Sequence, residues 1–270
     1  MSNKVYLIGS FHGFRDGIIQ ALPNLSFSDP RKHRQSSVLK LAYDDLKEAE
    51  ECPVALAVFP KGKSRGVMSY AEIGVAQAHG NHLIVVDEDT PDPLLEQLAD
   101  SHFSSLDEAI DFLKTNPNLE KKDAYIESKY PAGTDERLLV NTVLICGEVD
   151  EAIDNTYTEV REARPDRTVL FSEDAYQESR HMPRFDLIVA YFPANKDWNR
   201  HACFMMGAAY AHDISEVIVD EHGWKYPPLQ ALARRHCTLP HLAEYLTEVD
   251  DLHITAEAVN MYEFFKNQMP

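Results

Sequence analysis

Apolar residues in this chain gather in short continuous runs, and segments with a helical spacing of apolar residues separate these runs. Val5–Gly9, Pro53–Phe59 and His82–Asp87 are apolar through their interiors, which is typical of strands buried on both faces. Ser37–Glu50 and Ser69–His79 place apolar residues three and four positions apart, as amphipathic helices do. This alternation of strands and helices predicts a parallel sheet with helices on both faces.

The second half of the chain repeats this pattern at an offset of 133 residues. Val54–Pro60 corresponds to Leu187–Pro193, and Gly74 corresponds to Gly207. The same offset relates a strand, a loop, a helix and the next strand, which chance does not readily produce. We therefore predict an α/β protein with two tandem domains of the flavodoxin or Rossmann-like type, each a parallel sheet with helices on both faces.

The repeat also predicts the domain limits. Residues 1–115 form the first copy, 116–140 form a linker that contains Pro117, Lys121-Lys122, Pro131 and Gly133, and 141–270 form the second copy. The second copy ends in an amphipathic segment, Ile254–Asn267, which predicts one more helix. Two copies in one chain make a pseudo-dimer and leave further self-association open. In such sheets ligands bind at the carboxyl ends of the strands, so candidate site residues are sought there.

The overall charge narrows the classes of partner. Acidic residues outnumber basic residues by 44 to 26, which gives a net charge of −18. A field of this sign repels phosphate backbones, so we expect no nucleic-acid partner. Four cysteines without a CxxC pair suit a reducing cytoplasm, and no apolar run approaches the ~18 residues of a membrane helix. No HExxH or cysteine–histidine spacing supports a metal, and no motif supports an organic cofactor.

The loop after the first predicted strand runs from Gly9 to Arg15 and is a candidate anion site. Backbone N–H groups at Gly9 and Ser10 can approach an anion, and His12 and Arg15 can add charge-assisted contacts. The alternative is that the glycines here only turn the chain. The loop is neither a GxGxxG nor a Walker A motif.

A second candidate segment follows the predicted strand that ends at Phe59. Pro60–Gly66 is basic in an otherwise acidic protein, and Lys63, Ser64 and Gly66 lie near the carboxyl end of that strand. Such a position suits a phosphate or another anion. A solvated surface loop is the alternative.

Glu72 is the candidate on which most of the interpretation depends. It follows Ser69 by three residues, a spacing that is also typical of a capping box. Ser105 and Glu108 share this spacing, and there we predict only a cap. Glu72 differs because its helix begins directly after the basic loop, at the ligand end of the predicted sheet. In the second copy its position is occupied by Met205.

Tyr6 on the first strand is also lost from the second copy. When Gly9 is matched to Gly147, Leu144 takes the place of Tyr6. A repeat that keeps its glycine and loses its polar residues indicates that the polar residues serve a site and not the fold.

These segments together make the first copy similar to the nucleoside 2-deoxyribosyltransferase superfamily, which includes the 2′-deoxynucleoside 5′-monophosphate N-hydrolases. The resemblance covers about residues 4–115 and returns, weakened, in 141–246. The segments that carry it are Tyr6–Ser10, Asp45-Leu46, Glu72–Ala76 and His79-Gly80. Two further patterns resemble the N-hydrolase branch: G-S-x-x-G-x-R at Gly9–Arg15 and S-x-G-V at Ser64–Val67.

The resemblance implies an N-glycosyl transferase or hydrolase that acts on a small nucleoside or nucleoside 5′-monophosphate without a cofactor. It implies that Glu72 is the nucleophile at C1′, that Tyr6 orients it, and that Asp45, which neighbours Asp44, assists at the base or the sugar. The chemistry is that of a retaining glycosidase, in which water gives hydrolysis and a second base gives transfer. The alternative is a nucleotide-binding sensor or scaffold without turnover, because a fold alone does not determine a function.

Overall fold

The computed structural model contains all 270 residues and describes residues 4–9, 13–33, 38–124, 126, 138–194, 196, 198–221, 227–230, 232–233, 235–248 and 251–252. The chain divides into two compact units, Met1–Ile126 and Glu127–Pro270. Each unit has its own five-stranded sheet and its own hydrophobic core.

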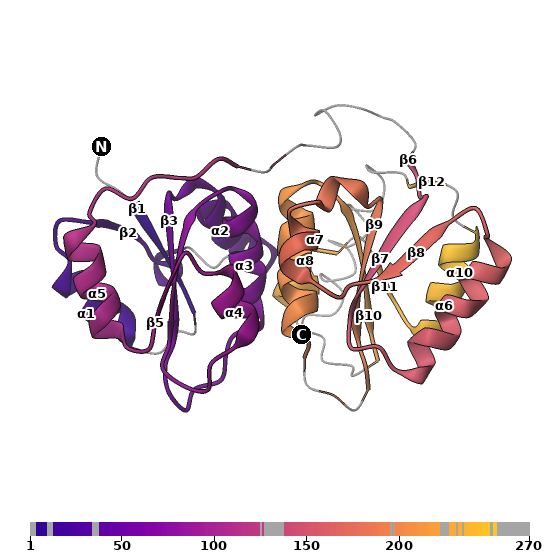
Figure 1. The fold of residues 1–270 in the computed structure, drawn as a ribbon, viewed down its shortest axis with the longest axis horizontal. Coiled ribbons are helices and arrows are strands. Elements are labelled where there is room, and N and C mark those ends of the chain that lie inside the picture. The colour runs from indigo at the N-terminus through magenta and orange to yellow at the C-terminus, as the bar shows by residue number, and fades with distance from the viewer. Residues whose placement is uncertain are drawn as a thin grey trace. The chain divides into compact units, whose positions relative to one another are not determined.

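The first unit is a parallel sheet in the order β2-β1-β3-β4-β5 (Figure 1). Its strands are β1 (Lys4–Ile8), β2 (Ser26–Ser28), β3 (Val54–Phe59), β4 (His82–Asp87) and β5 (Ser101–Phe103). Its helices are α1 (Phe14–Ala21), α2 (Val38–Glu51), α3 (Val67–Ala78), α4 (Pro93–Leu98) and α5 (Leu106–Thr115), with a 3₁₀ turn at Pro30–Lys32.

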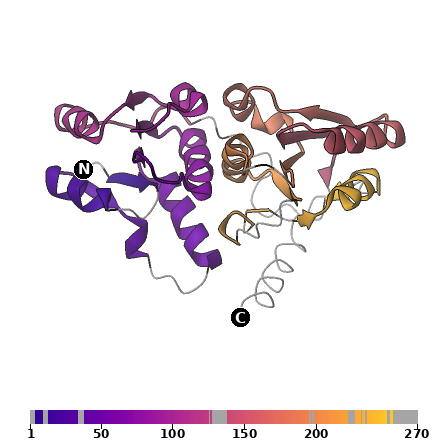
Figure 2. The same cartoon turned by 90° about the horizontal axis from the view of Figure 1, so that it is seen from below.

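Helices cover both faces of this sheet, as Figure 2 shows from below. Val5 and Leu7 of β1 join a core cluster with side chains of α1 and α5, so these two helices cover one face. Side chains alternate along a strand, so Tyr6 points to the opposite face. That face is covered by α3, which contacts β1, β3 and β4, and by α2, which packs on α3.

The second unit has a parallel sheet in the order β11-β10-β9-β7-β8. Its strands are β7 (Thr142–Gly147), β8 (Thr168–Phe171), β9 (Leu187–Phe192), β10 (Ser215–Asp220) and β11 (Arg235–Cys237). Its helices are α6 (Glu151–Ala163), α7 (Ala175–Ser179), α8 (Arg200–Ala211), α9 (Pro227–Gln230) and α10 (Leu239–Glu248), with a 3₁₀ turn at Met182–Arg184. A separate antiparallel pair joins β6 (Leu138–Leu139) to β12 (Asp251–Leu252).

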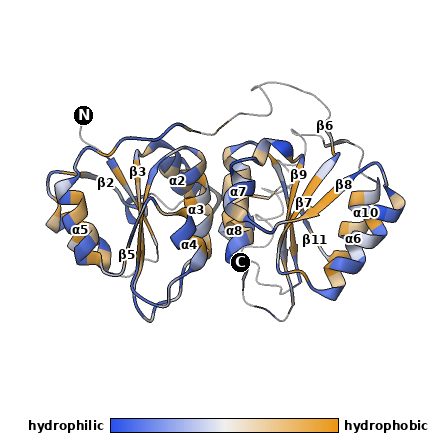
Figure 3. Ribbon diagram, in the orientation of Figure 1, coloured by the Kyte–Doolittle hydropathy of each residue, from blue (hydrophilic) through white to orange (hydrophobic). Residues whose placement is uncertain are grey.

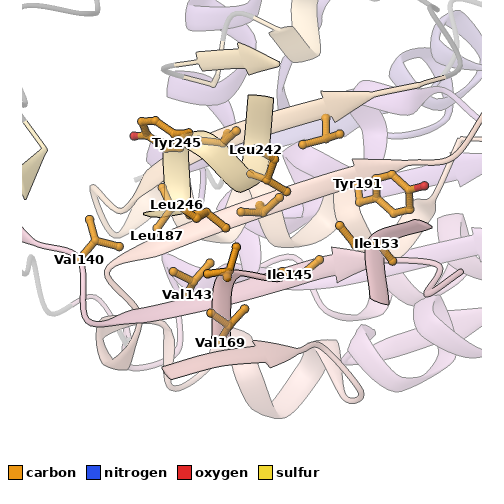
Figure 4. Close-up of a cluster of buried hydrophobic side chains, with 14 residues drawn as sticks. Val140, Val143, Ile145, Ile153, Val169, Leu187, Tyr191, Leu242, Tyr245 and Leu246 are labelled. Carbon is orange, nitrogen blue, oxygen red and sulfur yellow. The ribbon is translucent and has the colours of Figure 1, made fainter. Parts of the chain in front are cut away.

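The core of the second unit lies between its sheet and two helices. Figure 4 shows Val143 and Leu187 of the central strands packed against Leu242 and Leu246 of α10, with Ile153 of α6 nearby. The strands are hydrophobic and the outer helices are hydrophobic on one side only (Figure 3). Burial of such faces removes apolar area from water and stabilises each layer.

The two sheets have the same strand order when they are read from β2 and from β8, which confirms the predicted fold class. Several elements also begin and end at positions that differ by the offset seen in the sequence: β3 and β9, α3 and α8, β4 and β10, and α5 and α10. The units differ between their second and third strands, where α2 has 14 residues and α7 has five. The predicted helix at Ile254–Asn267 lies outside the described residues.

A glycine ends the first strand of each sheet for a steric reason. Gly9 has a φ of +131°, and a Cβ there would lie 2.5 Å from the carbonyl oxygen of Val58 in β3. Gly147 has a φ of +144°, and its Cβ would lie 2.3 Å from the carbonyl oxygen of Tyr191 in β9. Both positions therefore require glycine for the fold itself. Anion binding is not needed to explain Gly9.

Within the described part of the chain, every helix is too short or too polar to cross a lipid bilayer.

Candidate active site

Glu72 lies in the second turn of α3, on the helix face that the sheet and its neighbours bury. α3 is largely apolar, and Glu72 is only 6% exposed. The helix begins at Val67, with Gly66 as its N-cap residue, so Ser69 lies inside the first turn. The alternative interpretation of Ser69 and Glu72 as a capping box is therefore wrong.

The predicted cap at Ser105, by contrast, is confirmed. The Ser105 hydroxyl accepts the backbone N–H of Glu108 at 3.4 Å, at the start of α5. One sequence pattern therefore has two outcomes, because a cap needs the serine to precede the first helical residue.

Tyr6 is buried in the middle of β1, where its backbone pairs with Ser28 of β2 and Ala55 of β3. Among the described residues, its hydroxyl has no hydrogen-bond partner of ordinary geometry. Burial and the nearby carboxylates of Glu72 and Asp45 raise the pKa of Tyr6 well above its usual value. Tyr6 therefore remains a neutral hydrogen-bond donor close to both acids.

The structure separates the two neighbouring aspartates of α2. Asp44 lies toward the surface and pairs with Lys40 at 2.6 Å. Asp45 is 6% exposed, and its Oδ1 lies 2.8 Å from Nδ1 of His33. Burial raises the pKa of Asp45 to about 6, while His33 and Arg15 oppose the rise. Asp45 is therefore the aspartate that faces the site.

Glu72 and Asp45 form an electrostatically coupled pair. Burial, and then the charge of Asp45, raise the pKa of Glu72 well above its usual value, while Arg15 and the Tyr6 hydroxyl oppose the rise. Two carboxylates in one buried site do not ionise together easily, so one of them retains a proton at a pH where free acids are ionised. Such a pair can hold one nucleophilic carboxylate and one acid.

Arg15, whose charge acts on this pair, is buried at the start of α1. Nη1 donates to the carbonyl of Leu7 at 2.6 Å, and Nη2 donates to the carbonyl of Gly9 at 2.7 Å. Nη1 also lies 3.5 Å from Oδ1 of Asp29. That Arg15 binds a substrate stays a prediction, and the same holds for Gly9. Ser10 and His12, from the same loop, lie outside the described residues.

The basic loop before α3 presents some of its predicted residues to solvent. Lys63 and Ser64 are exposed, while Gly66 caps α3 through its backbone alone. Their roles in binding stay predictions.

Arg65, in the same loop, has a role that the sequence did not indicate. Its guanidinium pairs with Asp87 at 2.8 Å and with Asp92 at 2.9 Å. This arginine therefore anchors the loop to the end of β4.

His33, Asp29 and Glu48 are further residues near the site that sequence reasoning missed. His33 contacts Asp45, and its Nε2 lies 4.0 Å from Glu48, which also receives hydrogen bonds from Lys4 and Ser28. No motif marks these residues, because only the packing of the 3₁₀ turn and α2 against β1 and β2 brings them together.

The second unit has different chemistry at the corresponding positions. Met205 of α8 and Leu144 of β7 are buried apolar residues where the first unit has Glu72 and Tyr6. Glu178 in α7 corresponds to Asp45 by the offset, but its carboxylate accepts the backbone N–H of Glu173 and the hydroxyl of Ser172, from the loop before its own helix. The second unit therefore has no equivalent of the coupled pair among its described residues.

The described residues also contain no group of three or more histidine, cysteine, aspartate or glutamate side chains that could hold a metal ion.

No family model matches the sequence, and no curated protein matches it. Among solved structures, the chain is similar to the CMP N-glycosidase BcmB of Clostridium botulinum, with 17% identity and a TM-score of 0.31 over 42% of this chain and 99% of that one. It is also similar to two response-regulator/GGDEF-domain proteins of two-component systems, with 11% and 12% identity and a TM-score of 0.28. Each of those matches covers 98% of this chain and 99% of the other. These similarities are too low to assign a family or an activity.

Proposed function

We propose that the first unit cleaves or exchanges the N-glycosidic bond of a nucleoside or nucleoside 5′-monophosphate, with Glu72 as the nucleophile. The observation that carries the proposal is a 6% exposed carboxylate on a largely apolar helix, coupled to the buried carboxylate of Asp45. Burial of such a pair costs stability, and perturbed acids in one site are typical of catalytic centres. The motif resemblance at Tyr6–Ser10 and Glu72–Ala76 supports the same reaction.

In the proposed reaction a carboxylate oxygen of Glu72 attacks C1′ of the sugar, and the C1′–N bond breaks with its electron pair leaving on the base. Asp45, whose pKa is raised by burial, supplies the proton that the departing base needs. Tyr6 donates toward the acids and orients Glu72. Water then gives a proton to Asp45, attacks C1′ of the glycosyl ester and releases Glu72 as a carboxylate. In an exchange, a second base loses its proton to Asp45 and takes the sugar in the same way.

The proposal includes a division of labour between two copies of one domain. The limits are residues 1–115 for the catalytic copy, 116–140 for the linker and 141–270 for the second copy. The matching element bounds and the shared strand order support a duplication. Met205 and Leu144 support loss of the chemistry from the second copy.

A chromatographic assay of the full chain tests the reaction. The panel contains deoxynucleosides, ribonucleosides and their 5′-monophosphates, each with and without a second free base. We expect free base from the protein alone or a new nucleoside with the added base. Glu72→Gln should lower kcat by about 10³-fold or more while ligand binding remains. Glu96→Gln, a change at an exposed glutamate of α4, serves as the control.

Two outcomes contradict the proposal. A folded wild-type protein that binds a nucleotide but turns over no member of the panel would indicate the sensor or scaffold. Turnover that survives Glu72→Gln unchanged would remove Glu72 from the reaction.

A further inference from the structure

Arg15 has a place in the fold that differs from that of a ligand-binding arginine. It lies in the first turn of α1 and is 1% exposed. Two of its N–H donors hold the carbonyls of Leu7 and Gly9, at 2.6 and 2.7 Å, and the guanidinium lies 3.5 Å from Asp29. It therefore ties the end of β1 to the residue that follows β2.

A guanidinium that binds a phosphate turns its fork of donors toward the ligand. The fork of Arg15 is instead directed at backbone carbonyls on both sides of Ile8. To reach a substrate it would have to release these two carbonyls, and buried carbonyls that lose their donors are costly. These two carbonyls therefore engage donors of Arg15 that a phosphate would need.

We propose that Arg15 is a positioning residue of the active site: it fixes the backbone at the end of β1, which carries Tyr6, and keeps a permanent positive charge beside Glu72 and Asp45. It does not hold the phosphate of a substrate. The catalytic consequence rests on the function proposed above, whereas the charge and the geometry do not.

The charge matters because of the groups that face Glu72. These are Asp45 from α2, Tyr6 from β1 and Arg15 from α1. Burial and Asp45 raise the pKa of Glu72, whereas Arg15 and Tyr6 lower it. Without Arg15, burial and the charge of Asp45 still raise the pKa of Glu72, and of these groups only Tyr6 still lowers it. The pKa of Glu72 then rises further, and a smaller fraction of Glu72 is an ionised nucleophile at neutral pH.

The test is an NMR titration of the Glu72 carboxyl carbon in the full chain, assigned with Glu72→Gln. We expect Arg15→Gln to raise the pKa of Glu72 by about one unit or more, and Arg15→Lys to raise it less because the charge remains. Arg31→Gln is the control. Arg31 pairs with the other side of Asp29 at 2.7 Å and is not among the groups that shift Glu72, so its loss should leave the titration unchanged.

Kinetics supply a second readout. We expect Arg15→Gln to lower kcat for nucleosides and 5′-monophosphates alike and to move the acid limb of both pH profiles upward. An unchanged Glu72 titration, together with a KM that rises for monophosphates only, would overturn the proposal and make Arg15 a phosphate ligand. The titration needs no turnover, so failure of the proposed reaction does not disturb it.

Wild-type protein tests the proposal without any variant, should Arg15→Gln fail to fold. The Arg15 guanidinium N–H signals are followed while inorganic phosphate is added. We expect them to stay in place. A shift that saturates with phosphate would show that Arg15 binds the anion.

Discussion

At the scale of single residues, the candidate site depends on which of two adjacent carboxylates faces inward. Asp44 and Asp45 are chemically identical, but successive residues of a helix point in directions about 100° apart. Asp44 meets Lys40 at the surface, and Asp45 meets His33 in the interior. Burial raises the pKa of Asp45 to about 6.

This difference predicts a pH-dependent gain in stability for Asp45→Asn. The pKa of Asp45 in the folded protein, about 6, lies above the ordinary value of 3.8, mainly through burial and against His33 and Arg15. The folded state therefore binds this proton more tightly than the unfolded chain. This tighter proton binding stabilises the folded state fully below pH ~4, and the stabilisation is lost as pH rises through about 6. Asparagine does not titrate, so Asp45→Asn lacks this pH dependence. The free energy of unfolding of the variant, relative to that of wild type, should therefore be roughly 1–3 kcal/mol higher at pH 8 than at pH 4.

Urea titrations at the two pH values measure this gain. Asp44→Asn is the matched control, because its side chain lies toward the surface, and it should show little dependence on pH. Equal responses of the two variants would contradict the assignment of Asp45 to the interior.

Gly9 predicts a second effect at the residue scale. With a φ of +131° and only 2.5 Å between a Cβ and the Val58 carbonyl oxygen, Gly9→Ala should lower the free energy of unfolding by about 2 kcal/mol or more. Gly17→Ala, in the exposed part of α1 where a Cβ meets nothing within 4 Å, should raise it by about 0.5–1 kcal/mol. Chemical denaturation compares the two, and a tolerated alanine at position 9 would be evidence against the close approach.

At the scale of elements, α3 and α8 occupy corresponding places in the two units. Each has 12 residues, follows the central strand of its sheet and is buried along most of its length. A helix that is apolar on all sides is stabilised by burial. Glu72 interrupts this pattern in α3, and Met205 continues it in α8. We therefore expect Glu72 to cost the first unit stability that Met205 does not cost the second.

Exchange of these two side chains tests that cost. Glu72→Met should raise the free energy of unfolding and abolish turnover, as expected when an active site trades stability for function. Met205→Glu should lower the free energy of unfolding by about 3 kcal/mol or more, because it puts a charge where the side chain of Met205 is 0% exposed. Melting curves of both single variants, compared with wild type, measure these changes. Destabilisation by Glu72→Met would show that Glu72 supports the fold.

At the scale of the whole molecule, each unit contains the parts that a domain needs. The strands that pair in the first sheet all belong to residues 1–126, and the core cluster between β1, α1 and α5 lies within the same range. Local completeness of this kind is what allows a domain to fold alone.

We therefore expect residues 1–126, produced as a separate chain, to unfold cooperatively in urea. The surface exposed on unfolding scales with chain length, so the slope of stability against urea should be about half of that for a single unit of 270 residues. Circular dichroism follows the transition. A fragment that lacks a cooperative transition would mean that the second unit is needed for the fold of the first.

The amino-acid sequence by itself determined the class of fold and the repeat. Strands buried on both faces must be apolar runs, and amphipathic helices must follow a period of 3.6, so these elements are visible before any folding. Central strands such as Val54–Phe59 and their counterparts at the constant offset were therefore predictable. The sequence also marked Glu72 as a candidate site residue, because only the first copy has a glutamate at this position.

Only the tertiary structure decided what these residues contact. It turned Asp45 and not Asp44 inward, placed Ser69 inside α3, directed Arg15 to the carbonyls of Leu7 and Gly9, and brought His33 to Asp45. The physical reason is that such contacts join residues from different elements of the chain. Their distances follow from how whole helices pack on the sheet, and no local pattern of residues encodes that packing.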